Sequence, residues 1–309
     1  MSVSANPRET SKFSPRRGVR LKAFVRAFRL SQWAKNGLII LPLLAAHHLN
    51  HPSALLATLV AVGAFCLCDS SAYVLNDLLE LDADRAHPRK CKLLFETADL
   101  PLSAGVVMAP ALLILAFGLG ALLSVSFVIV LAGYYVLNVA YSLFLKSTVL
   151  LDTLMLACLY TLRIVAGAAA ANVPLSFWML LLSIFLFLSL ACVKRYAELD
   201  GLRTRDQLQA ADCGYEVRDL PILQNLGCSS GYLSVLVLAL YVNSPDVEAL
   251  YRHPRIICAL CLLLLFGISR IWMMAQRGAM WDDPVIFALK DGPSIGIGCL
   301  AVLIAILAT

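Results

Sequence analysis

Acidic residues gather at the end of the second apolar stretch of the chain. Asp77, Glu80 and Asp84 recur at intervals of three and four residues, which places them on one face of a helix. Asn76 borders this face, and Asp82 points to the opposite side. Hard oxygen ligands on one face suit Mg²⁺, which in proteins usually binds a substrate phosphate as well. We therefore predict a site in which the three carboxylates are catalytic and hold Mg²⁺.

A solvated helix end with surplus negative charge is the alternative interpretation of this segment. Basic residues directly downstream favour the metal site, because they supply cations for the phosphate that such a metal would carry. These residues are Arg85, Arg89, Lys90 and Lys92. Acidic groups at a membrane segment are also costly, and they are usually retained for function.

Other basic side chains lie inside apolar stretches and are candidates for phosphate contacts. Lys35 and Asn36 lie one turn inside the first stretch, where an interfacial anchor at Trp33 is the alternative interpretation. Arg163 lies deep in the fifth stretch, and its guanidinium suits bidentate phosphate binding. Asp152 shares its face, so the two either face one cavity or pair with neighbouring helices, and a purely structural ion pair is the alternative. The predicted phosphate-binding residues are Lys35, Asn36, Arg85, Arg89, Lys146, Arg163, Lys194 and Arg195.

Polar side chains continue the acidic face back into the second apolar stretch. Asp69 lies eight residues before Asp77, and Tyr73 lies midway between them. Two helical turns of polar groups predict a polar cavity in a helical bundle, because such groups are costly against lipid. An acid that is hydrogen-bonded in the bundle without a catalytic role is the alternative for Asp69. The predicted cavity residues are Asp69, Tyr73, Asn76, Tyr141 and Tyr196.

The chain that positions these residues is strongly apolar. Of its 309 residues, 60% are hydrophobic and 15% are charged, against about half and a quarter in soluble domains. Nine stretches reach or approach the length that spans a bilayer core of about 30 Å. They are residues 29–49, 53–76, 106–125, 127–144, 150–171, 175–193, 231–243, 255–275 and 294–308. We predict an all-α, polytopic membrane bundle of about nine helices.

The basic residues predict the orientation of this bundle. Nearly all of them lie in the N-terminal tail or after the second, fourth, sixth and eighth stretches. The positive-inside rule therefore places the N-terminus and the acidic segment in the cytoplasm and the C-terminus outside. We divide the chain into a basic, disordered cytoplasmic tail at residues 1–28 and one membrane domain at residues 29–309.

Charge and cysteine usage narrow the partners. The net charge of +5 and the basic tail suit the anionic surface of a lipid bilayer, and we expect no nucleic-acid partner. The ten cysteines lack the paired spacing of a zinc site, which indicates buried thiols. The sequence leaves the oligomeric state open, a homo-oligomer included.

Five short motifs, taken in their order along the chain, resemble those of the UbiA superfamily of intramembrane prenyltransferases. They are residues 32–36, 76–90, 145–146, 163–167 and 194–199. Within that superfamily the chain looks like the branch of polyprenyl-phosphate phosphoribosyltransferases, over about residues 28–309, and a later stretch at residues 269–288 adds to the likeness.

This resemblance implies a fold of nine transmembrane helices in a bacterial inner membrane. It also implies Mg²⁺ bound by Asn76, Asp77, Glu80 and Asp84 on a diphosphate donor. The implied reaction passes phosphoribose from phosphoribosyl pyrophosphate, or a related group from another diphosphate donor, to a polyprenyl phosphate lipid.

The chain departs from the pattern of that branch in several places, among them Gly292, where another basic residue is common. Glu80 stands where Asp is usual, and residues 91–98 lack two arginines, a proline and a glycine that the branch typically has. A catalytically drifted lipid-binding or transport protein is therefore one alternative. A prenyltransferase that uses a prenyl diphosphate and an aromatic acceptor is the other. Lys194 and Arg195 argue against it, because they stand in place of a second Asp-rich motif.

Overall fold

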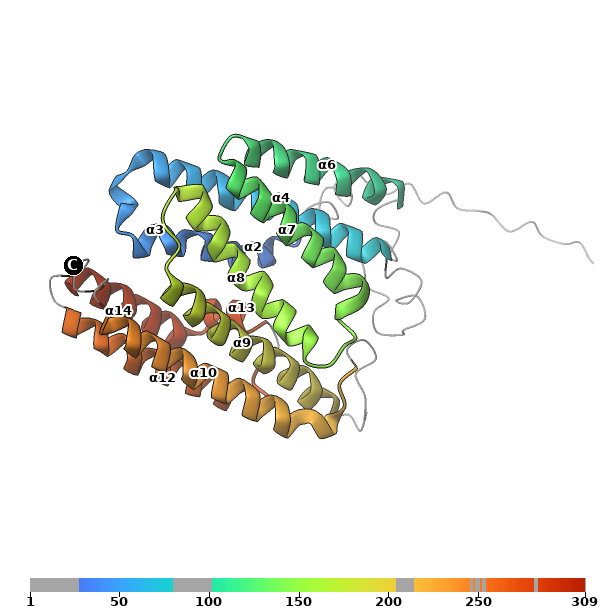
Figure 1. Cartoon of the computed structure of the whole chain (residues 1–309). Coiled ribbons are helices and arrows are strands. Elements are labelled where there is room, and N and C mark those ends of the chain that lie inside the picture. The colour runs from blue at the N-terminus through green and yellow to red at the C-terminus, as the bar shows by residue number, and fades with distance from the viewer. Residues whose placement is uncertain are drawn as a thin grey trace, which may run out of the picture.

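The computed structural model describes residues 28–79, 102–203, 214–244, 247, 251, 254–280 and 283–308, and within them it is helical and contains no strand. Seven helical segments in this part of the chain are long and apolar enough to cross a membrane. Their main helices are α4 (Pro52–Leu79), α6 (Leu102–Ala121), α7 (Val125–Ala140), α8 (Leu151–Ala171), α9 (Phe177–Arg203), α10 (Leu220–Val242) and α12 (Pro254–Gln276) (Figure 1). The predicted all-α membrane bundle is therefore confirmed.

The first and last predicted membrane stretches are both broken. The first consists of three short helices, α2 (Leu30–Trp33), η1 (Ala34–Ile40) and α3 (Leu41–Ala45). Pro42 contributes to this break, because it has no N–H to continue the hydrogen bonding of the helix. The last consists of α13 (Pro284–Lys290) and α14 (Gly292–Ala308), which meet at 84°. Counting this bent pair as one span gives up to eight among the described residues, so the count of nine stays a prediction.

The bend between α13 and α14 is held by one carboxylate. Asp291 accepts hydrogen bonds from the backbone N–H of Ser294 at 3.0 Å and from its hydroxyl. It also pairs with Arg270 of α12 at 2.8 Å. The start of α14 is therefore fixed to a neighbouring helix.

Two predicted boundaries were wrong, both beside the loop expected between residues 194 and 231. The helix α9 continues to Arg203, and α10 begins at Leu220 after the short helix η4 (Val217–Asp219). The charged residues from Lys194 onward end the apolar pattern of the sequence, but α9 continues through them. Arg195 is satisfied there by Asp152 of α8 and by Glu198 one turn further along α9.

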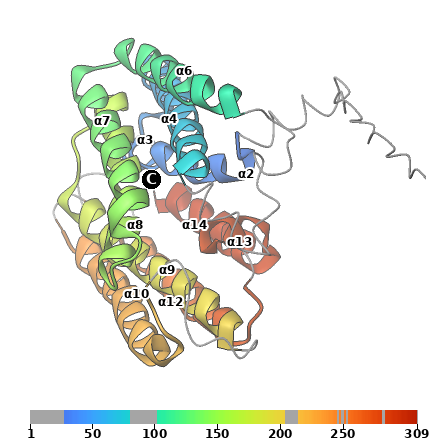
Figure 2. The ribbon, with the colours of Figure 1, turned by 90° about the vertical axis from the view of Figure 1, so that its right-hand side faces the viewer.

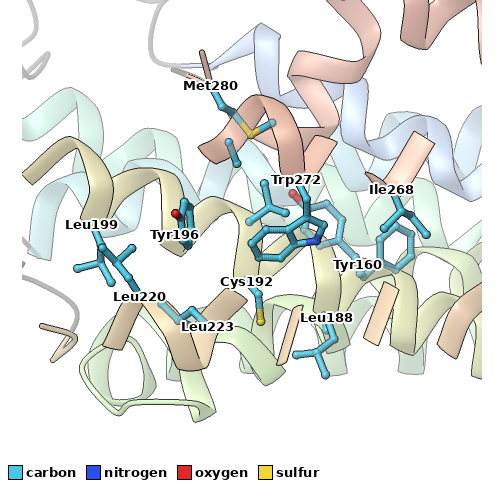
Figure 3. Close-up of a cluster of buried hydrophobic side chains, with 14 of the residues drawn as sticks. Tyr160, Leu188, Cys192, Tyr196, Leu199, Leu220, Leu223, Ile268, Trp272 and Met280 are labelled. Carbon is cyan, nitrogen blue, oxygen red and sulfur yellow. The ribbon is translucent and has the colours of Figure 1, made fainter. Parts of the chain in front are cut away.

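Two of the apolar clusters around which the described helices pack lie beside the predicted site residues. One lies between α4, α7 and α8 and includes Phe65 and Phe127. The other lies between α8, α9, α10 and α12 and includes Trp272 (Figure 3). In Figure 2, α4 and α6 lie on one side of the molecule, and α9, α10 and α12 lie on the opposite side. The polar side chains described below therefore come from several different helices.

A glycine permits the close approach of α10 to α12. A Cβ atom on Gly227 would lie 2.1 Å from the ring of Trp272. The indole N–H of Trp272 donates to the hydroxyl of Ser189 on α9 at 3.1 Å, so the three helices interlock. The close contact requires a residue without a side chain at position 227.

The ends of the helices that carry most of the predicted site lie at one end of the bundle. In Figure 1, the C-terminal ends of α4 and α9 and the N-terminal end of α8 lie together at the right. The C-terminus of the chain lies at the opposite end.

Candidate active site

The predicted metal-binding face begins in the last turns of α4. Asp77 is buried there, and its Oδ1 accepts a hydrogen bond from Nη2 of Arg29 at 2.6 Å. The guanidinium of Arg29 also lies 4.9 Å from the centre of the Tyr73 ring, at a distance typical of a cation–π contact. Asn76 is half-buried beside Asp77. The other predicted members of this face, Glu80, Asp84, Arg85 and Arg89, lie outside the described residues.

Asn76 and Asp77, the two predicted metal ligands among the described residues, have the right chemistry for Mg²⁺. A carboxylate and an amide are hard oxygen donors, and both come from adjacent positions of α4. They do not suffice alone, and in the described ranges no three His, Cys, Asp or Glu residues are grouped to hold a metal. The residues therefore fit Mg²⁺ only together with Glu80 and Asp84, and the metal site stays a prediction.

A buried network joins the first apolar segment to α4, α7 and α8. Nε of Arg163 donates to Asn36 Oδ1 at 2.9 Å, and its Nη2 donates to the Tyr134 hydroxyl at 2.7 Å and to Asp69 at 3.3 Å. Asp69 also accepts hydrogen bonds from Asn36 at 2.9 Å and from Tyr134. Nη1 of Arg163 donates to the carbonyl of Leu159. All three guanidinium nitrogens thus have partners inside the protein.

The sequence left open whether Arg163 and Asp152 face one cavity or pair with neighbouring helices. In the structure they do not pair with each other, and each pairs with a residue of a neighbouring helix. Arg163 is bound by Asp69 in a pair whose side chains are 5% and 2% exposed. The alternative in which Asp69 is an acid bonded within the bundle agrees with this geometry. A phosphate contact by Arg163 stays a prediction and would compete with an internal carboxylate.

Lys35 binds a carboxylate that lies far away in the sequence. Its Nζ donates to Asp283 Oδ2 at 2.7 Å, and the Tyr160 hydroxyl lies 3.1 Å from both oxygens of the same carboxylate. Asp283 also caps α13 by accepting from the N–H of Val285. Lys194 of α9 lies near enough to act electrostatically on Asp283. The Asp283 carboxylate is thus bound by Lys35 and Tyr160, and the charge of Lys194 acts on it from nearby.

Two opposing effects act on the Asp283 carboxyl group. Burial raises its pKa, but the adjacent Lys35 ammonium, through its charge and its hydrogen bond, lowers it, as does the charge of Lys194. The balance leaves the pKa of Asp283 below its ordinary value, because two nearby cations favour the ionised form.

Arg195 is held by a second buried network. Its guanidinium makes a bidentate pair with Asp152, donates to Glu198, and donates to the Tyr141 hydroxyl at 2.9 Å. Tyr141 opens a π-helical turn, Tyr141–Leu145, that leads to the half-buried Lys146. The guanidinium of Arg195 is therefore engaged by internal partners, as that of Arg163 is.

Lys194 differs from these cations. It is half-buried, and within the described ranges it forms no hydrogen bond or ion pair.

Tyr73 of α4 lies within electrostatic range of Arg29, Asp69, Arg163 and Asp283, so the groups of this end act on one another. Tyr196, by contrast, packs in the apolar cluster with its ring edge to Trp272.

The sequence reasoning missed several members of these networks. Tyr134 and Tyr160 were not singled out, although Tyr134 and Asn138 form an i, i+4 polar pair within an apolar helix. Asp283 was included only within the stretch at residues 269–288, and Arg29 only as the first residue of the stretch at 29–49. A polar pair at helical spacing was the one available signal.

An all-helical membrane protein with acidic and basic groups at one end of its bundle fits the class of intramembrane transferases. A family model described as the UbiA prenyltransferase family matches residues 38–278. The chain belongs to the UbiA prenyltransferase family. The resemblance found in the sequence is thereby confirmed.

Three relatives give the range of the similarity. An uncharacterized protein, y4nM, of Sinorhizobium fredii is 32% identical over 94% of this chain and 57% of that protein. The nodulation protein NoeC of Azorhizobium caulinodans is 34% identical over 88% of each chain. A decaprenyl-phosphate phosphoribosyltransferase of Mycolicibacterium smegmatis is 34% identical over 63% of this chain and 64% of that protein. The chain thus spans less than two thirds of the first and third of these relatives.

Solved structures share the fold. A UbiA homolog from Archaeoglobus fulgidus, bound to GPP and Mg²⁺, aligns with a TM-score of 0.67 over 93% of this chain and 99% of that one, at 13% identity. A digeranylgeranylglyceryl phosphate synthase aligns with a TM-score of 0.65 at 15% identity. At these identities the likeness establishes the helical architecture.

Proposed function

We propose that this UbiA-family transferase moves phosphoribose from phosphoribosyl pyrophosphate to a polyprenyl phosphate. The observation that carries the proposal is Lys194, a half-buried ammonium without a described partner, beside the Lys35–Asp283 pair. A partly buried cation is costly unless an anion joins it. A phosphate of a substrate would supply that anion. The similarity to a decaprenyl-phosphate phosphoribosyltransferase supports the same reaction.

The balance of charges at α9 supports a phosphoribosyl donor over a prenyl donor. The carboxylates nearest to Arg195, Asp152 and Glu198, are both paired with that guanidinium. They are therefore poorly placed to serve as a second acidic metal motif. A phosphoribosyl donor and a polyprenyl phosphate together bring three phosphate-bearing groups, whereas a prenyl diphosphate with an aromatic acceptor brings one. The cation-rich side suits the more anionic pair.

In the proposed reaction the bond between the anomeric carbon and the pyrophosphate oxygen breaks. An oxygen of the polyprenyl phosphate forms the new bond to that carbon, and pyrophosphate departs with the electron pair. The acceptor is already an anion, so the reaction needs no general base. Asp77, Glu80 and Asp84 would hold Mg²⁺, whose charge would offset the negative charge of the leaving group. Lys35 and Lys194 would bind substrate phosphates from the opposite side.

The direct test uses the purified protein with Mg²⁺, a polyprenyl phosphate and labelled phosphoribosyl pyrophosphate. We expect a labelled lipid, and we expect the Asp77→Asn variant to form none while it keeps a cooperative thermal transition. Transfer from a labelled prenyl diphosphate to an aromatic acceptor would instead identify the rival enzyme. No product in either assay, with a stable protein and an active control enzyme, would favour a lipid-binding or transport role.

A further inference from the structure

Arg29 has fewer internal partners than Arg163 and Arg195, the two buried arginines of this end of the bundle. Its Nη2 makes one hydrogen bond, to Asp77, and within the described ranges its other guanidinium N–H groups have no partner. Its side chain is 34% exposed, whereas those of Arg163 and Arg195 are each 5% exposed. Of these three guanidinium groups, that of Arg29 can therefore bind a ligand with the least rearrangement.

The position of Arg29 is fixed by the fold. Its backbone is left-handed, with φ 46° and ψ 50°, and its carbonyl accepts the N–H of Gln32 at 2.7 Å. Residues other than glycine adopt this conformation rarely, and they keep it where their surroundings determine it. Here the side chain lies over Tyr73 and reaches Asp77. The guanidinium is thus held against the residue expected to bind the metal.

We propose that Arg29 is an exchangeable counter-ion, which neutralises Asp77 before substrate binds and turns to the donor diphosphate when a divalent cation takes Asp77. This inference rests on the proposed function only for the use of a diphosphate donor. A buried carboxylate such as Asp77, whose side chain is 6% exposed, is costly without a positive partner. A metal ion and Arg29 therefore compete for it. Once displaced, the guanidinium can make bidentate contacts with phosphate oxygens.

The exchange predicts opposite effects on two affinities. Removing the guanidinium in Arg29→Gln removes a cation that competes for Asp77, so Mn²⁺ alone should bind about tenfold more tightly. The same variant loses a diphosphate contact, so inorganic pyrophosphate in the presence of saturating Mn²⁺ should bind about tenfold more weakly. A purely structural ion pair would not shift the two affinities in opposite directions.

The experiment measures both affinities on the full chain in nanodiscs, using Mn²⁺ electron paramagnetic resonance and labelled pyrophosphate. The Arg29→Lys variant keeps the charge but not the bidentate fork, and we expect smaller shifts in the same directions. Arg218→Gln is the matched control, because it breaks an arginine–glutamate pair of 2.7 Å on an 80% exposed side chain. It should change neither affinity.

Unchanged or weaker Mn²⁺ binding in a folded Arg29→Gln protein would overturn the proposal, as would unchanged pyrophosphate binding. If Arg29→Gln does not fold, the Arg29→Lys variant decides by the same two measurements. Neither probe contains a sugar or a prenyl group, so the result is independent of the phosphoribosyl assay. Opposite shifts would support the exchange even if the true donor proved to be a prenyl diphosphate.

Discussion

At the scale of single residues, candidate phosphate-binding cations are already bound to carboxylates of the protein. Arg163 pairs with Asp69, and Lys35 pairs with Asp283. Breaking such a buried pair is strongly destabilising, because one charge is left uncompensated. A residue that binds substrate here therefore has to exchange an internal anion for an external one.

The Asp283 carboxylate predicts a pH-dependent contribution to stability. Its pKa is lowered in the folded protein, so its stabilising effect is present above the unfolded pKa of about 3.9 and is lost as pH falls through the lower folded value. We expect Asp283→Asn to reduce the free energy of unfolding by about 3 kcal/mol at neutral pH. The difference from the parent protein should shrink below about pH 4.

Thermal unfolding in detergent between pH 7 and pH 3 measures this difference. Tyr160→Phe is the control, because it removes one hydrogen bond to the carboxylate and leaves the Lys35–Asp283 pair in place. It should cost about 1 kcal/mol and keep the pH dependence. A destabilisation by Asp283→Asn that is equal at both ends of the pH range would contradict the assignment.

Sequence reasoning identified both members of the Arg163–Asp69 pair but only Lys35 of the Lys35–Asp283 pair. Asp69, Lys35 and Arg163 stood out because they are polar residues in apolar stretches. Their pairing could not be predicted, because Lys35 and Asp283 are 248 residues apart in the chain. Periodicity along one helix shows which side chains share its face, but it does not show which helix lies opposite.

At the scale of the helices, close packing of backbone segments positions the cationic residues. A Cβ atom on Gly167 of α8 would lie 2.1 Å from the carbonyl oxygen of Ile39 in η1. The contact is with backbone, which cannot rotate away as a flexible side chain could. Gly167 therefore lets η1 lie against α8, where Asn36 reaches Arg163.

We predict that Gly167→Ala will displace η1 and lower both stability and transferase activity. Overpacking of this kind costs about 1–3 kcal/mol, and here it should also shift Lys35 and Asn36. The measurements are the thermal transition and the rate of lipid labelling. Gly133→Ala on α7 is the matched control, because its added Cβ would meet nothing within 4 Å. Equal behaviour of the two variants would show that the close contact is unimportant.

The helices themselves were largely predictable, and their breaks and ends were not. Apolar length located the seven long spans, because a bilayer demands it. It failed where charged residues continue a helix, as in α9, and where a proline interrupts an apolar stretch, as in the first segment. In those places tertiary partners and local backbone chemistry decide the structure.

At the scale of the whole molecule, the candidate site lies at one end of the bundle and the C-terminus at the other (Figure 1). We predict that the site end faces the cytoplasm, from the excess of Lys and Arg there. In a bacterial host, a fluorescent protein fused to the N-terminus should fluoresce. An alkaline phosphatase fused to the C-terminus should be active, because that enzyme requires the periplasm.

A phosphatase inserted at Asn172, directly after the last residue of α8, provides an internal control and should also be active. If both fusions were inactive, the orientation would be the reverse of the one predicted here. If only the C-terminal fusion were inactive, the chain would cross the membrane one time fewer than predicted.

The buried ion pairs also constrain how the chain can be made. Arg163 lies 94 residues after Asp69, and Asp152 lies 43 residues before Arg195. When α8 leaves the ribosome, Asp69, the partner of Arg163, has therefore already been synthesised. Arg195, the partner of Asp152, has not. We expect the translocon to retain α8 until α9 emerges, so that both charges leave the channel already neutralised and the two helices enter the lipid as one unit.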